Sequence, residues 1–466
     1  MNSITDLLDL EDSNIYISDV RIEGTRKILT LETAVTVHFC PICGYRMHSR
    51  GIKTRTINHP VLQDTYELVL KLKQRRWRCT NEQCAYTANE SFNFVNKRRR
   101  NTNATDMLII NAFRDLSASA SGIAARFNMS DSSALEIFDR YVKMDRLPLS
   151  DILSIDEVCL DLDPHCRYAL VLQDFYTGNP IDLLSSRRSH DAESFFVSIP
   201  LSERAGVKYL ISDMYNPYIS WCRQYFPNAT PVVDSFHVIQ WIIRKLENYI
   251  RDLIKKFRKR DRDIYISNGG QIDEHTRIPL SREVYLLQKY RWIILANQNS
   301  ITYHSDLRMD PHLHCMMNTF DYEDSLFSID PQLRKLRDLK ELYVQFNTLN
   351  AGKPMDARIE LDQLIDRYLH CDSIIFNDFA NLLIRYHDYI INSFVMVEKH
   401  GSGKIYSSRL SNGPIESLNR KAKDLKRLGR GYRNFEHFRN RFLYATRENP
   451  VINGSSSHST VTQYKY

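Results

Sequence analysis

The sequence contains no run of about 18 consecutive apolar residues, the length that a helix needs to cross a bilayer. Its first residues, MNSITDLLDLEDS, are acidic and lack the basic and apolar segments of a secretory signal peptide. These absences exclude a membrane-spanning protein and predict a cytoplasmic one that does not bind a membrane. The nine cysteines are then expected to be reduced unless they bind a metal.

The composition is that of a globular protein, with 43% hydrophobic and 26% charged residues among 466. This length predicts two to four domains. The net charge of +7 is modest, but the basic residues are clustered. They gather at 97–100, at 244–262 and at 416–441, and each of the last two segments has nine Lys/Arg against three acids. Such clusters are typical of surfaces that bind DNA or RNA, although a solvated helix face explains any single run equally well.

Four of the cysteines form two pairs on either side of a strand-like segment. They are Cys40, Cys43, Cys79 and Cys84. Residues 65–78 between the pairs alternate apolar and basic side chains, as a strand does. Two Cys pairs on β-hairpins predict a zinc ribbon with a structural Zn²⁺ ion, and His38 or His48 is an alternative ligand. The other five cysteines show no ligand spacing.

Three short amphipathic helices are predicted after the basic run, at 105–116, 121–128 and 132–142. Ser130 or Asp131 is a suitable cap for the third. Two helices joined by a short turn and rich in small residues indicate a helix-turn-helix that binds DNA. The predicted DNA contacts of this region are Lys97, Arg98, Arg99, Arg100, Ser132 and Ser133.

Five strands are predicted next, at 153–162, 167–178, 181–189, 208–215 and 230–238. Three antiparallel strands followed by alternating helix and strand predict a multidomain α/β protein with a catalytic core of the RNase H type. Asp156 and Asp213 each lie where an apolar strand ends. Carboxylates at the ends of adjacent strands can converge, so both are candidate ligands of Mg²⁺ or Mn²⁺.

A third candidate, Glu416, is a single acid at the head of the basic segment 416–441. One carboxylate among cations repels phosphate unless it binds a metal that itself meets phosphate. Glu416 lies 203 residues after Asp213, and the residues between about 241 and 409 have helical periodicity. We therefore expect an all-helical insertion that interrupts the core before its final helix.

The residues alone leave alternatives open. Asp156 is followed by Glu157 and two further acids, so the local choice of ligand is uncertain. Asp234 competes with Asp213 from spacing alone. His237 either assists a leaving group or forms a hydrogen bond in the core, and the core position is favoured.

Five motifs occur along the chain in this order: CPICG with WRC, SIDE, SDMYNPY, VVDSFHV and SNGPIESLNRKAKDLKR. Together they resemble those of the bacterial insertion-sequence transposases of the ISL3 family. The resemblance covers nearly the whole chain. It implies that Asp156, Asp213 and Glu416 form the DDE triad of an RNase H-like core, with Asp213 preferred over Asp234. It further implies two Mg²⁺ or Mn²⁺ ions that activate water for nicking and then the freed 3′-hydroxyl for strand transfer.

The resemblance also implies partners: double-stranded DNA, as terminal inverted repeats and target, and a second copy of the chain in a dimer or larger synaptic complex on the nucleoid. Phosphate contacts are expected from Arg420, Lys421, Lys423, Lys426 and Arg427. Two alternatives are a catalytically silent DNA-binding regulator and a structure-specific nuclease on the same fold. Inverted repeats beside the gene would favour a transposase over both.

The predicted domains are the zinc ribbon at 1–96, the helix-turn-helix at 97–147, the first part of the core at 148–240, the helical insertion at 241–409, the final core helix with its Glu at 410–450, and a disordered tail at 451–466.

Overall fold

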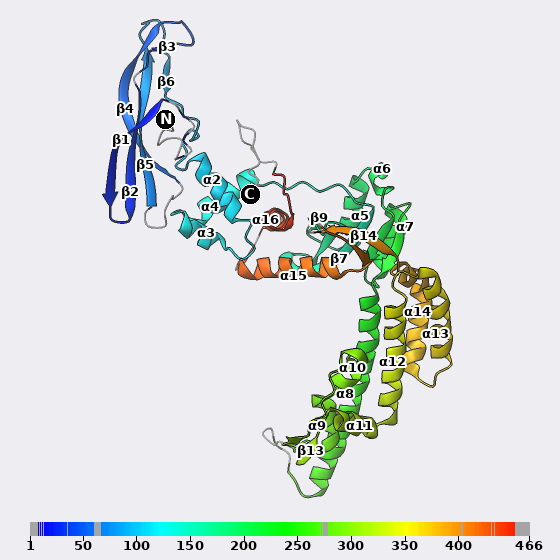
Figure 1. Ribbon diagram of the computed structural model, residues 1–466. Coiled ribbons are helices and arrows are strands. Elements are labelled where there is room, and N and C mark those ends of the chain that lie inside the picture. The colour runs from blue at the N-terminus through cyan, green and yellow to red at the C-terminus, as the bar shows by residue number, and fades with distance from the viewer. Residues whose placement is uncertain are drawn as a thin grey trace. The chain divides into compact units, whose positions relative to one another are not determined.

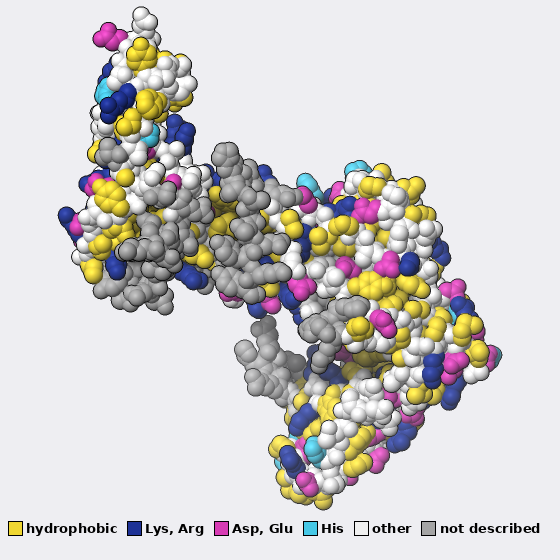
Figure 2. Space-filling view, turned by 45° about the horizontal axis from the view of Figure 1, so that its top comes forward, with side chains coloured by type: hydrophobic (Ala, Val, Ile, Leu, Met, Phe, Trp, Pro, Cys, Tyr) yellow, Lys and Arg dark blue, Asp and Glu magenta, His cyan; other side chains and the backbone are white. Residues whose placement is uncertain are grey.

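The computed structural model describes residues 14–34, 36–59, 67–271, 278–401, 404–429 and 434–452, together with 8, 10, 12, 273, 431 and 432. Most of the predicted tail therefore lies outside the described residues. The chain is a mixed α/β protein with two compact units (Figure 1), one formed by residues 1–146 and 421–466 and the other by 147–420. Lys and Arg side chains lie on the described surface of both (Figure 2). Among the helices described, none is long and apolar enough to cross a membrane.

The first unit begins with a six-stranded sheet in which β1-β2-β5-β4-β3 are neighbours and β6 pairs with β5. The strands are β1 (Ile15–Glu23), β2 (Arg26–Thr33), β3 (His38–Phe39), β4 (Arg46–Asn58), β5 (Glu67–Cys79) and β6 (Thr87–Asn89). Strands β1 and β2 form a hairpin in which Gly24 has φ +62°, a conformation that favours glycine. Alternate residues of β5, Leu68, Leu70 and Leu72, are buried against Leu31 of β2, as the period-two pattern predicts.

The helices of this unit are α2 (Asn103–Ala112), α3 (Ala120–Arg126), α4 (Asp131–Tyr141) and α16 (Phe435–Thr446). Ser130 caps α4, because its side chain accepts a hydrogen bond from the backbone N–H of Ser133. The ring of Phe138 in α4 packs against Phe113 after α2 and against Tyr444 in α16. The C-terminal helix is therefore part of the same apolar core as the three helices at 103–141.

The second unit contains a five-stranded sheet with the order β11-β10-β7-β8-β9. Its strands are β7 (Ile152–Asp163), β8 (Cys166–Asp174), β9 (Pro180–Leu184), β10 (Tyr209–Ser212) and β11 (Thr230–Val233). The first three pair antiparallel, whereas β10 is parallel to both β7 and β11. Between β9 and β11 lie α5 (Ser189–Ser198), α6 (Leu201–Arg204) and α7 (Asn216–Tyr225). Leu153 and Ile155 of β7 pack in one apolar cluster with Phe196 of α5 and Trp221 of α7, so these helices cover one face.

The long helix α8 (Ser235–Ser267) follows β11 directly and organises the rest of this unit (Figure 1). The elements after it are α9 (Arg282–Lys289), α10 (Trp292–Leu295), η1 (Gln298–Ser300), β12 (Arg308–Asp310), β13 (Cys315–Met317), α11 (Thr319–Ile329), α12 (Pro331–Leu349), α13 (Pro354–Leu369), α14 (Ile374–Asn392), β14 (Met396–Gly401), β15 (Lys404–Arg409) and α15 (Gly413–Leu428). Helices α12 and α14 contact α8 and share a large apolar cluster with it.

The prediction of an all-helical insertion is wrong in two places, because β12–β13 and β14–β15 are antiparallel hairpins. At the first hairpin, the Asp310 carboxylate accepts hydrogen bonds from the backbone N–H groups of His312 and Leu313. An aspartate that binds the backbone two and three residues ahead stabilises a turn in place of a helix. The helical segment also starts at Ser235, earlier than the predicted boundary at 241.

Candidate functional site

Asp156 and Asp213 lie side by side because β7 and β10 are parallel neighbours. The register of the two strands ends with Ile211 opposite Ser154. Asp213 and Asp156 each follow two residues later, so both side chains are on the same face of the sheet. Together with Glu157, their carboxylates form one group whose ligand atoms lie within 4.8 Å of one another.

These acids lie in an electrostatically unfavourable place. Burial, together with the negative charges of Glu157, Asp213 and Glu416, raises the pKa of Asp156 to about 7. Burial and then the charge of Glu157 also raise the pKa of Asp213. The Oδ1 atom of Asp213 is buried and has no hydrogen-bond partner among the described residues. Such an arrangement is stabilised by a cation.

Glu416 lies in the first turn of α15, where its charge raises the pKa of Asp156, but its carboxylate groups with Asp234 and His237 and not with the two aspartates. Three residues later on the same helix, Asn419 donates a hydrogen bond from Nδ2 to Asp156 Oδ2 at 2.8 Å. Because residues three apart lie on one face of a helix, Glu416 and Asn419 both face β7. The structure therefore brings Glu416 near Asp156 across more than 200 residues of sequence, in a second group of ligand atoms beside that of the two aspartates.

Asp234 and His237 lie next to Glu416 at the start of α8. Asp234 caps the helix, and its two oxygens accept backbone N–H bonds from Phe236 at 3.0 Å and from Asn412 at 2.7 Å. Both oxygens of Asp234 are therefore used by the backbone, whereas Oδ1 of Asp213 is not used by any described residue. His237 does not have the hydrogen-bonded core position that we expected. Its Nε2 atom has no hydrogen bond to a described residue and lies 3.8 Å from Glu416 Oε1.

Two further residues contribute to this site. Glu157 accepts hydrogen bonds from Arg187 Nη1 at 2.7 Å and from the Tyr218 hydroxyl, which hold its carboxylate beside Asp156. The sequence indicated Glu157 as an alternative ligand because it follows Asp156 directly in the SIDE motif. Asn419 had no such signal, because an amide in a basic helix has no distinctive spacing.

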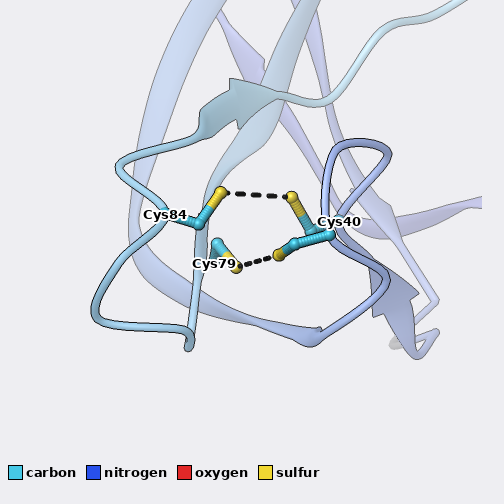
Figure 3. A group of neighbouring side chains, drawn as sticks. Cys40, Cys79 and Cys84 are labelled. Atoms are coloured by element: carbon cyan, nitrogen blue, oxygen red, sulfur yellow. Dashed lines mark hydrogen bonds between the residues drawn. The ribbon is translucent and has the colours of Figure 1, made fainter.

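The four paired cysteines converge in the first unit at the ends of β4 and β5 (Figure 3). Cys40 and Cys84 have their Sγ atoms 3.8 Å apart, and those of Cys43 and Cys79 are 3.4 Å apart. Four thiolates at about 2.3 Å from a tetrahedral Zn²⁺ ion are separated by roughly 3.8 Å. All four are free thiols, and the hydrogen bond of the Tyr45 backbone lowers the pKa of Cys43 to about 7.

Neither alternative histidine belongs to that group of ligand atoms. The His38 ring instead packs against that of Trp77 in a tilted arrangement with centroids 4.3 Å apart, and its Nε2 lies 2.9 Å from the hydroxyl of Thr36. The described cysteine cluster thus has a complete set of four sulfur atoms.

The other predicted DNA contacts are mostly exposed. Those with exposed side chains are Lys97, Arg98, Arg100, Ser132, Arg420, Lys421, Lys423 and Arg427. Arg99 and Lys426 are half-buried, and Arg99 lies 3.5 Å from Glu136. Ser133 is used in the cap of α4, which leaves Ser132 as the more accessible of the two serines.

The model of the ISL3 transposase family matches residues 153–442. The chain belongs to the ISL3 family of transposases. The resemblance read from the sequence motifs is thereby confirmed. The transposase for insertion sequence element IS1001 of Bordetella parapertussis is 23% identical to this ISL3-family chain over 422 residues, which are 89% of this chain and 90% of that protein. The family match includes all three candidate acids and the helical part between them, and it ends within α16.

Proposed function

We propose that this ISL3-family protein is the transposase of an insertion sequence and that it cuts and joins DNA by a DDE mechanism. Asp156, Asp213 and Glu416 would be the catalytic acids. The observation that carries the proposal is the pairing of Asp156 with Asp213, whose Oδ1 is buried and unpaired, beside Glu416, whose charge acts on Asp156 from a distant helix. The strand order, three antiparallel strands followed by two parallel ones, supports an RNase H-like core.

The donor set fits divalent cations of the Mg²⁺ or Mn²⁺ type, because these ions prefer carboxylate oxygens. A buried unpaired carboxylate oxygen is destabilising without a cation, and so is the mutual repulsion that raises the pKa of Asp156. When bound, two such ions activate the attacking oxygen and stabilise the leaving one. The chain itself positions the acids: Asn419 holds Asp156, and Arg187 holds the neighbouring Glu157.

The other elements support recognition of DNA. The four cysteines would hold a structural Zn²⁺ ion that fixes the end of the first sheet, and α3 and α4 would form the helix-turn-helix that contacts the terminal inverted repeats. Exposed cations on α15 would bind phosphates and so position the DNA ends near the acids. Since two ends are cut and joined together, we expect at least two chains in the complex.

The test is cleavage and joining of labelled duplexes that carry the ends flanking the gene, with the full chain and Mg²⁺ or Mn²⁺. The variants are Asp156→Ala, Asp213→Ala and Glu416→Ala, and the control is Asp191→Ala, which removes an acid on α5. We expect cation-dependent cuts at the ends in the wild type and the control, and none in the three variants, with DNA binding retained.

The same assay separates the alternatives. Binding of the ends without cutting under either cation would assign the chain to the regulators. Cutting that does not depend on the inverted-repeat sequence would indicate a nuclease. In both cases the proposed transposition chemistry would be refuted.

A further inference from the structure

Helix α8 has two opposite faces of very different character. Its buried residues, among them Ile242, Leu246 and Leu253, pack into the apolar cluster of the helical part. The opposite face carries five exposed cations, Arg244, Arg251, Lys255, Arg258 and Arg262. At 100° per residue these five lie within an arc of about 60°, and at 1.5 Å per residue they extend over about 27 Å. We call them the α8 stripe.

Most of the charge on the α8 stripe is not neutralised within the protein. Arg244, Arg258 and Arg262 make no hydrogen bond or ion pair with any residue that the structure describes. Arg251 pairs with Glu247 at 3.0 Å but remains 59% exposed, and Lys255 pairs with Asp252 and remains 77% exposed. Exposed pairs of this kind contribute only about 0–1 kcal/mol, so they do not prevent a stronger anion from binding.

The stripe is also aligned with the cluster of acids. His237, whose Nε2 lies 3.8 Å from Glu416, is seven residues before Arg244, which is seven before Arg251. Residues seven apart lie on nearly the same face of a helix. The face of α8 that begins at the acids therefore continues into the stripe, and α8 extends away from the sheet along the helical part (Figure 1).

We propose that the α8 stripe binds the phosphate backbone of duplex DNA without reading its sequence and so guides the DNA that leaves the candidate active site. This inference rests on the proposed function and adds a surface that neither the catalytic acids nor the helix-turn-helix provides. Four of the five cations are arginines, whose planar guanidinium groups suit phosphate oxygens. A length of 27 Å corresponds to about 8 base pairs of duplex.

The test compares two triple variants of the full chain. The first replaces Arg244, Arg258 and Arg262 by Gln, which favours helices and removes no described contact. The matched control replaces Lys353, Arg367 and Arg385 by Gln, three exposed cations at the start of α13, near its end and on α14. Both variants lose the same charge, and thermal unfolding checks that both remain folded.

The measurement is the affinity for a duplex without inverted repeats, as a function of salt. Each phosphate contact contributes about 0.9 to the slope of log K against log salt, so the stripe variant should have a slope smaller by about 2.7. A rise from 50 to 200 mM salt then weakens the wild type about 40-fold more than the stripe variant. The control should keep the wild-type slope, and the three Arg→Lys changes should largely restore it.

Equal slopes for the stripe variant and the control would overturn the proposal. The proposal would also be overturned if the wild type bound an acidic polypeptide such as polyglutamate, the stripe variant did not, and the two proteins had the same salt slope for DNA. The stripe would then bind protein. Neither result affects cleavage of the terminal repeats, so the proposed function can stand while this inference fails. If the wild type binds no duplex at all, both the proposed function and the α8 stripe proposal are refuted. The role of the three acids is tested by the cleavage assay alone.

Discussion

Replacement of Asn419 by Ala tests the geometry of the site without removing an acid. The side chain is 6% exposed, and its Nδ2 atom donates to Asp156 Oδ2 at 2.8 Å and more weakly to the Glu157 carbonyl at 3.4 Å. The Asn419 amide thus links α15, which bears Glu416, to β7, which bears Asp156. Its loss should allow the two acids to separate.

The expected effects differ in size. A hydrogen bond to a carboxylate contributes about 1.5–3 kcal/mol, so the free energy of unfolding of the second unit should fall by about that amount. A displacement of about 1 Å at a catalytic group can slow a reaction by about 10²-fold. We therefore expect Asn419→Ala to reduce the cleavage rate by about two orders of magnitude, which is far more than the fraction of unfolded protein explains.

Asn350→Ala is the matched control. Asn350 is equally buried and donates from Nδ2 to the Glu360 carboxylate at 2.6 Å, but it lies between α12 and α13, outside the cluster of acids. Both variants should lose similar stability in denaturant titrations, whereas only Asn419→Ala should lose single-turnover cleavage of labelled ends. If the two variants cut at the same rate, Asn419 stabilises the fold and does not position Asp156, and our reasoning is wrong.

Three further outcomes are expected. Asp213→Asn should abolish the upward shift of thermal unfolding that Mg²⁺ produces in the wild type, while stability without cation stays equal or rises because a buried like charge is removed. Cys43→Ser should lower bound zinc, measured by native mass spectrometry, from one ion per chain to near zero and expose the ends of β4 and β5 to protease. Burial raises the pKa of Asp106 to about 6. The contribution of this raised pKa to stability is complete below pH 4 and is lost as pH rises through 6. Asp106→Asn should therefore stabilise the first unit by up to about 3 kcal/mol at pH 7 and not at pH 4.

The sequence predicted most of the features that depend on local patterns. The apolar run before Asp213 corresponds to β10, which ends at Ser212, and the two cysteine pairs lie at the ends of paired strands. The expected strand end at Asp156 is wrong, because β7 continues through it to Asp163. Capping chemistry named Ser130 as one of two candidates for the start of α4, and the structure has Ser130. These features are readable because burial and turns impose short, fixed spacings on the chain.

Other features depend on contacts between distant residues, which no local spacing records. The hydrogen bond of Asn419 to Asp156 joins residues 263 positions apart, and that of Arg187 to Glu157 joins the segment between β9 and α5 to β7. The hairpin of β12 and β13 was missed because each strand is only three residues long and the turn depends on the carboxylate of Asp310. Helical periodicity on both sides concealed it.

The two ends of the helical insertion are joined by hydrogen bonds beside the acids. These bonds explain how Glu416 lies near Asp156 although the insertion separates them in the sequence. Asp234 begins the insertion as the cap of α8, and its second oxygen accepts the backbone N–H of Asn412, which immediately precedes α15. Arg409, at the end of β15, donates hydrogen bonds to the hydroxyl of Ser235 and to the hydroxyl and carbonyl of Ser393. The first and last residues of the insertion therefore belong to one hydrogen-bond network. We expect a change of length within the helices between them to preserve this network and the position of Glu416.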